Sequence, residues 1–271
     1  MEPYNVKVIT YPDLTRQYRV YRKVVEHRPR QESREANPFD GKWTWDIKGD
    51  IKEHYEHVNE VSLKRTKKKV YDYARCNEWE WFVTFTFNGK KVDRYDYEEC
   101  AKKLSEWLRN LKRVNRNMEY VVVPERHKDG AWHFHGLFAG LEQGETEWTG
   151  RNVVKRVKDG KRSRFVRTKE KIYRIGKYKL GWMTATRVRE REKVTSYITK
   201  YITKDMLAGL YGKKRYWASR GLLVPVEEVY TLDAVDRFIL SSELAEDARY
   251  RKVSEVCYGD MTQSVEIFEL S

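Results

Sequence analysis

The sequence is poor in cysteine. Its 271 residues include only Cys76, Cys100 and Cys257, which lie far apart. A disulfide framework or a zinc ribbon needs several cysteines at short, paired intervals, so neither class of small stabilised fold is indicated. We therefore expect a protein of a reducing compartment, the cytoplasm.

Long apolar runs and nucleotide-binding loops are also missing. No stretch of the sequence approaches the roughly 20 apolar residues that a membrane-spanning helix needs, and the N-terminus has no signal-peptide pattern. The phosphate-binding sequence Gly-x-x-x-x-Gly-Lys-Ser/Thr does not occur either, which argues against a P-loop motor domain. We expect a soluble chain that does not contact a membrane.

Positive charge is what the sequence has in excess. It has 55 Lys and Arg against 41 Asp and Glu, a formal net charge of +14. A chain this basic usually binds a polyanion, most often nucleic acid. Residues 151–180 hold 13 basic and 2 acidic residues, a net charge of +11, whereas residues 225–271 hold 4 basic and 11 acidic residues, a net charge of −7. We therefore place the polyanion-binding surface in the middle of the chain.

Short segments rich in aromatic and β-branched residues predict strands. The clearest are WFVTFTF (Trp81–Phe87), YVVVPE (Tyr120–Glu125), WHFHGLF (Trp132–Phe138) and GWMTATRVRE (181–190). An Asp-Gly turn pair separates the second and third segments, and this arrangement predicts a β-hairpin.

Apolar residues spaced three and four apart predict helices between and after these strands. The spacing is clear over 96–114, imperfect over 51–75, and present over 192–209, where Gly209 would end the helix. The order of elements predicts an α+β fold. We expect an antiparallel central sheet of four to five strands with helices packed on one face, plus an N-terminal helix and a C-terminal extension.

Composition divides the chain into three segments. Residues 1–50 are polar and predicted to be irregular, residues 51–224 hold the predicted sheet and helices, and residues 225–271 form the acidic extension. Residues 141–180 form a basic insert within the central segment. An Asp-Gly pair at 159–160 interrupts it, so we expect a hairpin arm that projects from the domain.

The stretch WHFHGL places two histidines two residues apart on a predicted strand. Side chains alternate between the two faces of a strand, so His133 and His135 share one face and Phe134 lies on the other. Convergent imidazoles favour a divalent metal, and a carboxylate allows Mg²⁺ or Mn²⁺. The predicted hairpin brings Glu125 to that face as the third ligand, with His127 a weaker candidate in the turn. The alternative is a pair of partly buried histidines with structural hydrogen bonds.

The stretch SYITKYITK repeats the sequence Tyr-Ile-Thr-Lys. On a helix, residues four apart share a face, so Tyr197 and Tyr201 lie one turn apart, and Lys200 and Lys204 form a neighbouring stripe. A phenol is a poor nucleophile at neutral pH, but a nearby ammonium group or metal favours the phenolate. Opposite a metal-binding histidine pair, these residues would form a phosphoryl-transfer centre. The alternative is a helix whose tyrosines pack on the sheet and whose lysines are solvated.

Together these motifs resemble those of HUH endonucleases, and most closely the rolling-circle replication initiators of phages and plasmids, of the filamentous-phage gene II and microvirus types. The similarity covers about residues 60–225 and rests on FVTFTF, PERHKDGAWHFHGL and SYITKYITK. The histidine motif precedes the tyrosine motif, as in replication initiators, whereas conjugative relaxases have the reverse order. The residue between the histidines is hydrophobic in the family, as Phe134 is here.

The resemblance implies metal-assisted nicking and joining of single-stranded origin DNA. One tyrosine attacks a phosphodiester, becomes linked to the 5′-phosphate and frees a 3′-hydroxyl that primes a polymerase. In two-tyrosine relatives, the second tyrosine cleaves after one round and the freed end closes a circle. Tyr197 and Tyr201 match these positions, each followed three residues later by a lysine, and we slightly favour Tyr197 as the first nucleophile. His133, His135 and Glu125 would hold Mg²⁺ or Mn²⁺.

The resemblance also implies partners in a bacterial host cell. We expect single-stranded origin DNA, a host helicase and a host polymerase. The basic block can follow a phosphate backbone. Trp148 and Tyr173 are candidates for stacking on unpaired bases. The candidate DNA-binding residues are Lys155, Arg156, Lys161, Arg162, Arg164 and Arg167.

Three other functions remain open. An HUH-type transposase would use the same chemistry on the ends of a mobile element. A non-catalytic DNA-binding replication regulator would keep the basic surface around an inactive site, although the intact histidines and tyrosines argue against it. A metal-dependent hydrolase would use water and form no covalent bond to DNA.

Overall fold

The computed structural model describes residues 2–26, 48–159, 162–202, 210, 212–258 and 261–271; near the ends of some elements, including α1 up to residue 60, only the backbone is described. The chain divides into two compact units. The central unit is Ile51–Leu222, and the terminal unit combines Met1–Asp50 with Leu223–Ser271. Residues from both predicted flanking segments thus share one unit.

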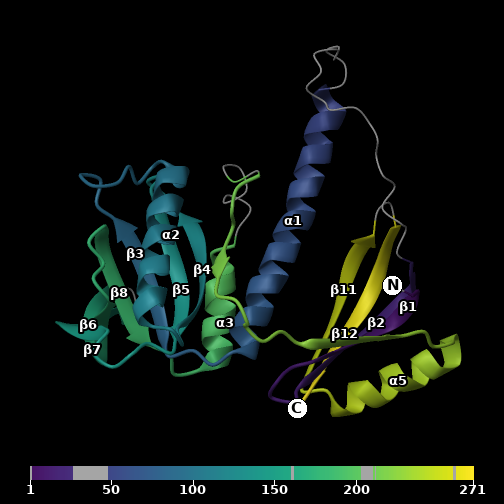
Figure 1. Ribbon diagram of the computed structural model, residues 1–271. Helices are drawn as coiled ribbons and strands as arrows, with labels where there is room; N and C mark the ends of the chain where they lie inside the picture. The colour runs from purple at the N-terminus through teal and green to yellow at the C-terminus, as the bar shows by residue number, and fades with distance from the viewer. Residues whose placement is uncertain (1, 27–47, 160–161, 203–209, 211, 259–260) are drawn as a thin grey trace. The chain divides into compact units, whose positions relative to one another are not determined.

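The central unit is built on a seven-stranded antiparallel sheet (Figure 1). In space the strands follow the order β6-β7-β8-β3-β5-β4-β9. The predicted hairpin is confirmed, because β4 and β5 pair antiparallel. The expectation of four to five strands was too low, since it did not count both strands of the basic arm or the short β9. The strands are β3 (Trp81–Phe87), β4 (Glu119–Arg126), β5 (Trp132–Ala139), β6 (Thr146–Asp159), β7 (Arg162–Ile175), β8 (Gly181–Arg187) and β9 (Trp217–Ala218).

Helices cover both faces of this sheet, so the prediction of helices on one face is wrong. On one face, Phe134 of β5 packs into a cluster with the apolar side of α2 (Tyr97–Val114). On the other face, Leu137 of the same strand packs with residues of α1 (Lys48–Cys76) and α3 (Arg191–Lys200). Strands buried on both faces are apolar almost throughout. The run Val121–Val123 of β4 has this pattern, so the sequence held a signal for the second helical layer.

Helix α2 follows directly from its sequence. The Asp96 carboxylate accepts hydrogen bonds from the backbone N–H groups of Glu98 and Glu99, which satisfies free donors at the helix start. Leu104, Leu108 and other apolar residues at helical spacing are buried against the sheet.

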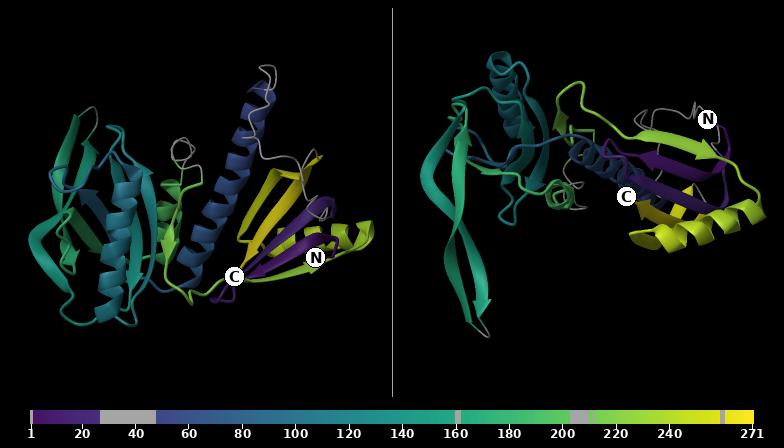
Figure 2. Two further views of the ribbon diagram at one scale, coloured as in Figure 1. Left: turned by 45° about the horizontal axis from the view of Figure 1, so that its top comes forward. Right: turned by 90° about the horizontal axis from the view of Figure 1, so that it is seen from below.

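Strands β6 and β7 form the basic arm expected from the sequence. Figure 2 shows them as a long, twisted two-stranded ribbon that extends away from the rest of the sheet. One residue pair defines the register between the arm and the rest of the sheet: Tyr173 of β7 is opposite Ala185 of β8. Most of the described side chains of the arm are exposed, so the arm has little apolar core of its own.

The terminal unit is a five-stranded antiparallel sheet with one helix, α5 (Ala234–Asp247), which packs on it through Leu244. In space the strands follow the order β10-β1-β2-β12-β11. The chain therefore begins in strands, so the prediction of an irregular first segment is wrong there, whereas the helix predicted over 51–75 is present as α1. Those strands pair with partners from the other end of the sequence, which a local pattern cannot reveal. The strands are β1 (Tyr4–Thr10), β2 (Arg16–Val25), β10 (Val226–Tyr230), β11 (Tyr250–Tyr258) and β12 (Met261–Leu270).

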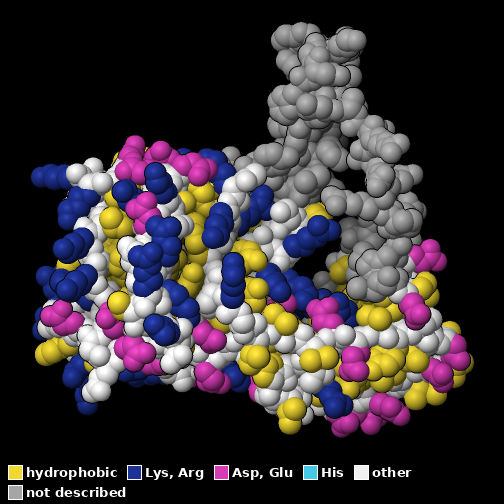
Figure 3. All heavy atoms as spheres, viewed as in Figure 1, with side chains coloured by type: hydrophobic (Ala, Val, Ile, Leu, Met, Phe, Trp, Pro, Cys, Tyr) yellow, Lys and Arg dark blue, Asp and Glu magenta, His cyan; other side chains and the backbone are white. Residues whose placement is uncertain are grey.

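Charge differs between the surfaces of the two units. Figure 3 shows many Lys and Arg side chains on the visible face of the central unit, whereas Asp and Glu side chains gather over α5 in the terminal unit. None of the helices in the described part of the chain is both long enough and apolar enough to cross a membrane.

Substitution of Gly181 tests how closely β8 approaches the end of β3. The Cβ of an alanine at this position would overlap the carbonyl oxygen of Thr86 and lie 2.7 Å from the backbone nitrogen of Asn88. These backbone atoms cannot move without disturbing the pairing of β3 with β8. We expect Gly181→Ala to lower the free energy of unfolding by about 1–3 kcal/mol or more. Denaturation followed by tryptophan fluorescence measures this, because seven of the nine tryptophans belong to the central unit.

Gly89→Ala is the matched control for this experiment. It lies in the turn after β3, and no atom is within 4 Å of the added Cβ. We expect it to change the free energy of unfolding by no more than about 0.5 kcal/mol. Equal stabilities for the two variants would contradict the close contact between Gly181 and the backbone at the end of β3.

Candidate active site

The two histidines of β5 lie on the sheet face covered by α1 and α3. His133 is opposite Glu125 of β4, and His135 is opposite Thr84 of β3. The intervening Phe134 packs into the core on the α2 side. The structure thus has the alternation of faces that the strand pattern predicted, with both imidazoles on one side.

His135 is held from two sides. It is only 5% exposed. Its Nδ1 lies 3.1 Å from the hydroxyl of Thr84, and its Nε2 lies 2.7 Å from a carboxylate oxygen of Glu125. The hydrogen bond with His135 lowers the pKa of Glu125, and the neighbouring imidazoles of His133 and His127 lower it further. Glu125 is therefore a carboxylate at neutral pH, and it fixes the ring of His135.

His133 contacts a histidine that the sequence analysis ranked below Glu125. Its ring stacks on that of His127, with centroids 4.9 Å apart and planes 11° apart. His127 in turn lies 3.1 Å from the Asp129 carboxylate. Burial lowers the pKa of His133, and the nearby His127 and His135 rings lower it further. The neutral form that this favours is the form that binds a metal.

The donor set has the chemistry of a divalent-cation site but is not a preformed cage. Two imidazoles and one carboxylate on adjacent strands suit Mn²⁺ and related ions. Thr84 also supplies the hydrogen bond to the far ring nitrogen that metal-binding histidines usually make. Among the described residues, however, no three His, Cys, Asp or Glu side chains are gathered closely enough to hold a metal. Instead, Glu125 and His135 bond to each other.

The tyrosine helix is shorter than the sequence predicted. Helix α3 ends at Lys200, Tyr201 is its C-cap residue and Ile202 is not helical, whereas residues 203–209 of the predicted helix, including Lys204, lie outside the described residues. β-Branched residues lower helix propensity, and this segment is rich in isoleucine and threonine. The buried hydroxyl of Thr199 also turns back to the carbonyls of its own helix.

Tyr201 meets the histidine pair directly. Its ring stacks on that of His135, with centroids 3.6 Å apart and planes 8° apart. Burial raises the pKa of Tyr201, and a hydrogen bond with Tyr197 and the charge of Glu125 raise it further. As the structure stands, this phenol is therefore hard to ionise.

Tyr197 is the more accessible of the two tyrosines. It is 45% exposed, and its ring meets that of Tyr201 edge-on at 5.3 Å. The ammonium group of Lys200 lies 5.6 Å from the centre of the Tyr197 ring. The structure thus brings both tyrosines and one of the two lysines to the face that carries the histidines.

Two residues of β3 that the sequence analysis did not single out complete the site. Phe82 lies beneath both tyrosines, with ring centroids 5.1 Å from Tyr197 and 6.5 Å from Tyr201. Thr84 orients His135. A signal for them exists in FVTFTF, because the threonines recur at alternate positions of an otherwise aromatic strand and mark a more polar face.

The candidate DNA-binding residues lie away from this centre, on the basic arm. Lys155, Arg156, Arg164 and Arg167 are exposed, whereas Lys161 and the side chain of Arg162 lie outside the described residues. Each of the four exposed cations faces an apolar residue across the ribbon, and Phe165 is 76% exposed. These pairs are Lys155–Val166, Arg156–Phe165, Arg164–Val157 and Arg167–Val154.

The two aromatic residues proposed for base stacking differ in their surroundings. The ring of Tyr173 packs edge-on against Trp81, with centroids 5.0 Å apart, and belongs to the rim of the core. Trp148 is half exposed, and Lys171 lies 5.1 Å from its ring. Only Trp148 therefore presents an open aromatic surface.

The histidine strand and the tyrosine helix meet at one place, and a family comparison spans both. Residues 80–206 match the family model of the replication-associated protein ORF2/gene II protein. This confirms the predicted resemblance to the filamentous-phage gene II type over that range and implies a role in initiating rolling-circle DNA replication. No curated protein and no solved structure matches the chain.

The family match covers the parts that build the candidate site. It begins just before β3 and includes β4, β5, the basic arm, β8 and α3. The terminal unit, helix α1 and strand β9 lie outside the match. The family comparison therefore bears on the sheet with its histidines and tyrosines, and leaves the remainder of the chain to be interpreted from its structure.

The contact between His135 and Glu125 predicts that the pKa of Glu125 changes when His135 is replaced. The lowered pKa of Glu125 means that the folded chain favours the carboxylate, so this contact stabilises the fold at neutral pH and loses its effect as the pH falls through that pKa. In metal-free buffer we expect His135→Leu to raise the pKa of Glu125, because the hydrogen bond is removed while burial remains. A carboxyl ¹³C NMR titration measures it.

Asp129 is the internal control in the same spectra. Its pKa is lowered mainly by the backbone N–H of Ala131, which His135→Leu leaves in place. We expect no change there. An unchanged Glu125 titration in the variant would mean that the 2.7 Å contact does not exist in solution.

Proposed function

We propose that this protein nicks and rejoins single-stranded DNA at a replication origin through a covalent tyrosine–DNA intermediate. The observation that supports this most is the stacking of Tyr201 on His135, with ring centroids 3.6 Å apart. It brings the tyrosine pair and the candidate metal-binding histidines to one side of the sheet. The replication-associated family match over residues 80–206 supports the same setting.

We propose Tyr197 as the first nucleophile. Its side chain is exposed and can meet an incoming phosphodiester, whereas Tyr201 is half-buried against His135. Lys200 lies beside the Tyr197 ring and would favour the negative charge that develops on the phenol oxygen. Tyr201 would act second, once its ring has left His135.

The proposed reaction is a transesterification. The phenol oxygen of Tyr197 attacks the phosphorus, the bond from phosphorus to the 3′-oxygen breaks, and the tyrosine becomes joined to the 5′-phosphate. The phenol gives up its proton to solvent, and the departing 3′-oxygen takes one up to become a hydroxyl. One phosphoester bond replaces another, so rejoining of the DNA strand needs no nucleoside triphosphate. A 3′-hydroxyl that later attacks the phosphotyrosine releases the enzyme.

His133, His135 and Glu125 are the residues that would hold Mg²⁺ or Mn²⁺. Such a cation, when bound, polarises the phosphate and makes the phosphorus easier to attack. Thr84 holds one nitrogen of His135, so the other faces Glu125. Cation binding would therefore need the hydrogen bond between Glu125 and His135 to open.

The basic arm would bind DNA outside this centre. Its exposed cations can neutralise backbone phosphates without reading sequence, and its apolar residues fill the space between them. A host helicase and a host polymerase would act on the strands that the reaction frees.

A covalent adduct is the direct test of this function. We expect the purified protein, incubated with labelled single-stranded origin oligonucleotides and Mn²⁺ or Mg²⁺, to retain the label on a denaturing protein gel. The adduct should vanish in the Tyr197→Phe, Tyr201→Phe double variant, because no phenol remains at the site. His133→Ala should reduce adduct formation at least tenfold through loss of a metal ligand.

The single tyrosine variants and the products separate the alternatives. Tyr197→Phe should lose more adduct than Tyr201→Phe if Tyr197 acts first. Cleavage without any adduct would favour a metal-dependent hydrolase that uses water. Binding without cleavage would favour a replication regulator, and either result would refute the proposed mechanism.

The basic arm gives a second prediction. Replacing Lys155, Arg156, Arg164 and Arg167 by glutamine should weaken duplex DNA binding and make its salt dependence shallower by about 0.9 in log–log slope for each phosphate that the arm no longer neutralises. Fluorescence anisotropy at several salt concentrations measures the slope. A control variant removes four exposed cations from α2 and the turn after it and should keep the wild-type slope. These control positions are Lys102, Arg109, Arg113 and Arg116. Equal slopes for the two variants would contradict the assignment of the arm as a DNA-binding surface.

A further inference from the structure

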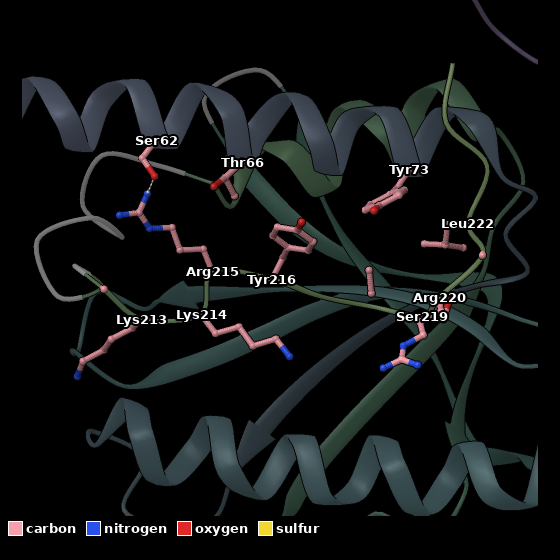
Figure 4. A pocket seen from close by; sticks show the side chains of 13 residues that line it. Ser62, Thr66, Tyr73, Lys213, Lys214, Arg215, Tyr216, Ser219, Arg220 and Leu222 are labelled. Atoms are coloured by element: carbon pink, nitrogen blue, oxygen red, sulfur yellow. Dashed lines mark hydrogen bonds between the residues drawn. The ribbon is translucent and has the colours of Figure 1, made fainter. Parts of the chain in front are cut away.

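The central unit contains a basic groove that the proposed reaction does not use (Figure 4). Its volume is about 820 Å³, and it lies between α1 and residues 212–222, which include β9. The groove is thus separate from the candidate site under α3.

Positive charge dominates this groove. Lys213, Lys214, Arg215 and Arg220 line it, and its described lining residues include no Asp or Glu, although Lys213 forms an ion pair with Glu98 at 3.2 Å. In Figure 4 the side chains of Lys214 and Arg220 extend toward one another along one side of the groove. Two positive charges that converge, with no carboxylate among the described lining residues, favour an anionic ligand.

Partial burial adds to this preference. It lowers the pKa of Lys214 and of Arg215, because burial disfavours their charged forms. The ammonium of Lys214 lies 5.3 Å from the centre of the Trp217 ring. Arg215 donates a 2.6 Å hydrogen bond to the hydroxyl of Ser62. A bound anion would stabilise the charged ammonium of Lys214.

Aromatic and hydroxyl groups complete the walls. Tyr73 on α1 and Tyr216 on the facing segment bring their rings to 6.3 Å, and Thr66 adds a hydroxyl on α1. Cations that follow a phosphate backbone, combined with aromatic rings on which bases stack, are the usual features of surfaces that bind single-stranded nucleic acid.

The groove lies close to the candidate active site. Strand β9 pairs with β4 at Val121 and Val122, and β4 pairs with the histidine strand β5. Two strand spacings, about 10 Å, therefore separate β9 from β5. Tyr73 and Tyr216 pack against the same apolar cluster as Tyr201. A DNA strand held at the tyrosines can therefore reach the groove over a short distance.

We propose that this groove binds the phosphate backbone of the single-stranded DNA that flanks the scissile phosphate. The inference rests on the proposed function, since that function supplies the strand. Single-stranded rather than duplex DNA is the ligand because the tyrosine rings can stack only on unpaired bases. Lys214 and Arg220 would contact the phosphates, and Tyr73 and Tyr216 would contact the bases.

Removal of the two converging charges tests the groove. The full-length protein carrying Lys214→Gln and Arg220→Gln should bind fluorescein-labelled oligo(dT) more weakly than the wild type. The slope of log affinity against log salt should become shallower by about 1.4, or about 0.7 for each phosphate of a single strand that is no longer neutralised. Anisotropy titrations at several salt concentrations give the slope. Binding to a mixed-sequence duplex should keep its wild-type slope.

A matched variant controls for the removal of two charges. Lys102→Gln with Arg109→Gln removes one lysine and one arginine from the exposed side of α2. It should keep the wild-type slope for oligo(dT). The inference is overturned if the groove variant also keeps that slope, or if both variants change it equally.

Different results would refute the groove proposal and the proposed function. The groove variant should still form the tyrosine–DNA adduct at saturating DNA, because Tyr197 and the histidines are untouched. An adduct together with an unchanged oligo(dT) slope would refute the groove alone. Absence of an adduct in the wild-type protein would refute the proposed function, while the oligo(dT) slope would still report whether the groove binds a single strand.

Discussion

The stacking of the Tyr201 ring on the His135 ring is the contact on which the candidate site depends. It joins the end of α3 to the central strand β5 at a centroid distance of 3.6 Å. Phe82 supports it from β3, and the Glu125 carboxylate and the Thr84 hydroxyl fix the orientation of His135. Without this contact, the tyrosines and histidines would belong to two separate elements with no chemistry in common.

Helices cover both faces of the central sheet, so one strand can contribute side chains to the core on one face and to the candidate site on the other. The α2 face is a continuous aromatic and aliphatic cluster that includes Phe134. The opposite face admits polar groups where β3, β4 and β5 present Thr84, Glu125 and His135 in adjacent register. Since side chains alternate along each strand, packing on the α2 face helps to fix the strands whose opposite face carries these polar groups. The site is therefore positioned by packing on the face that it does not occupy.

Local periodicity explains which parts could be predicted from sequence. The aromatic strands, helix α2 and the shared face of His133 and His135 follow from spacings of two, three and four residues. The pairing of Val6 with Tyr230 could not be predicted, because it joins opposite ends of the sequence. The contact between Tyr201 and His135 was expected only as an approach of two motifs. Spacing within a motif does not determine how a helix end packs on a sheet, nor that Glu125 would bond to His135 rather than stand apart from it.

The central claim is that the tyrosines and a histidine-bound cation share one gap, and paramagnetic NMR tests it most directly. Substoichiometric Mn²⁺ added to protein with ¹³C-labelled tyrosine rings should broaden the signals of Tyr197 and Tyr201 first. Tyr178, which packs in the cluster on the α2 face, should broaden less, because the sheet lies between its ring and the histidines. The selective broadening should disappear in His133→Ala. Equal broadening of all tyrosines, or none at Tyr197 and Tyr201, would contradict the account.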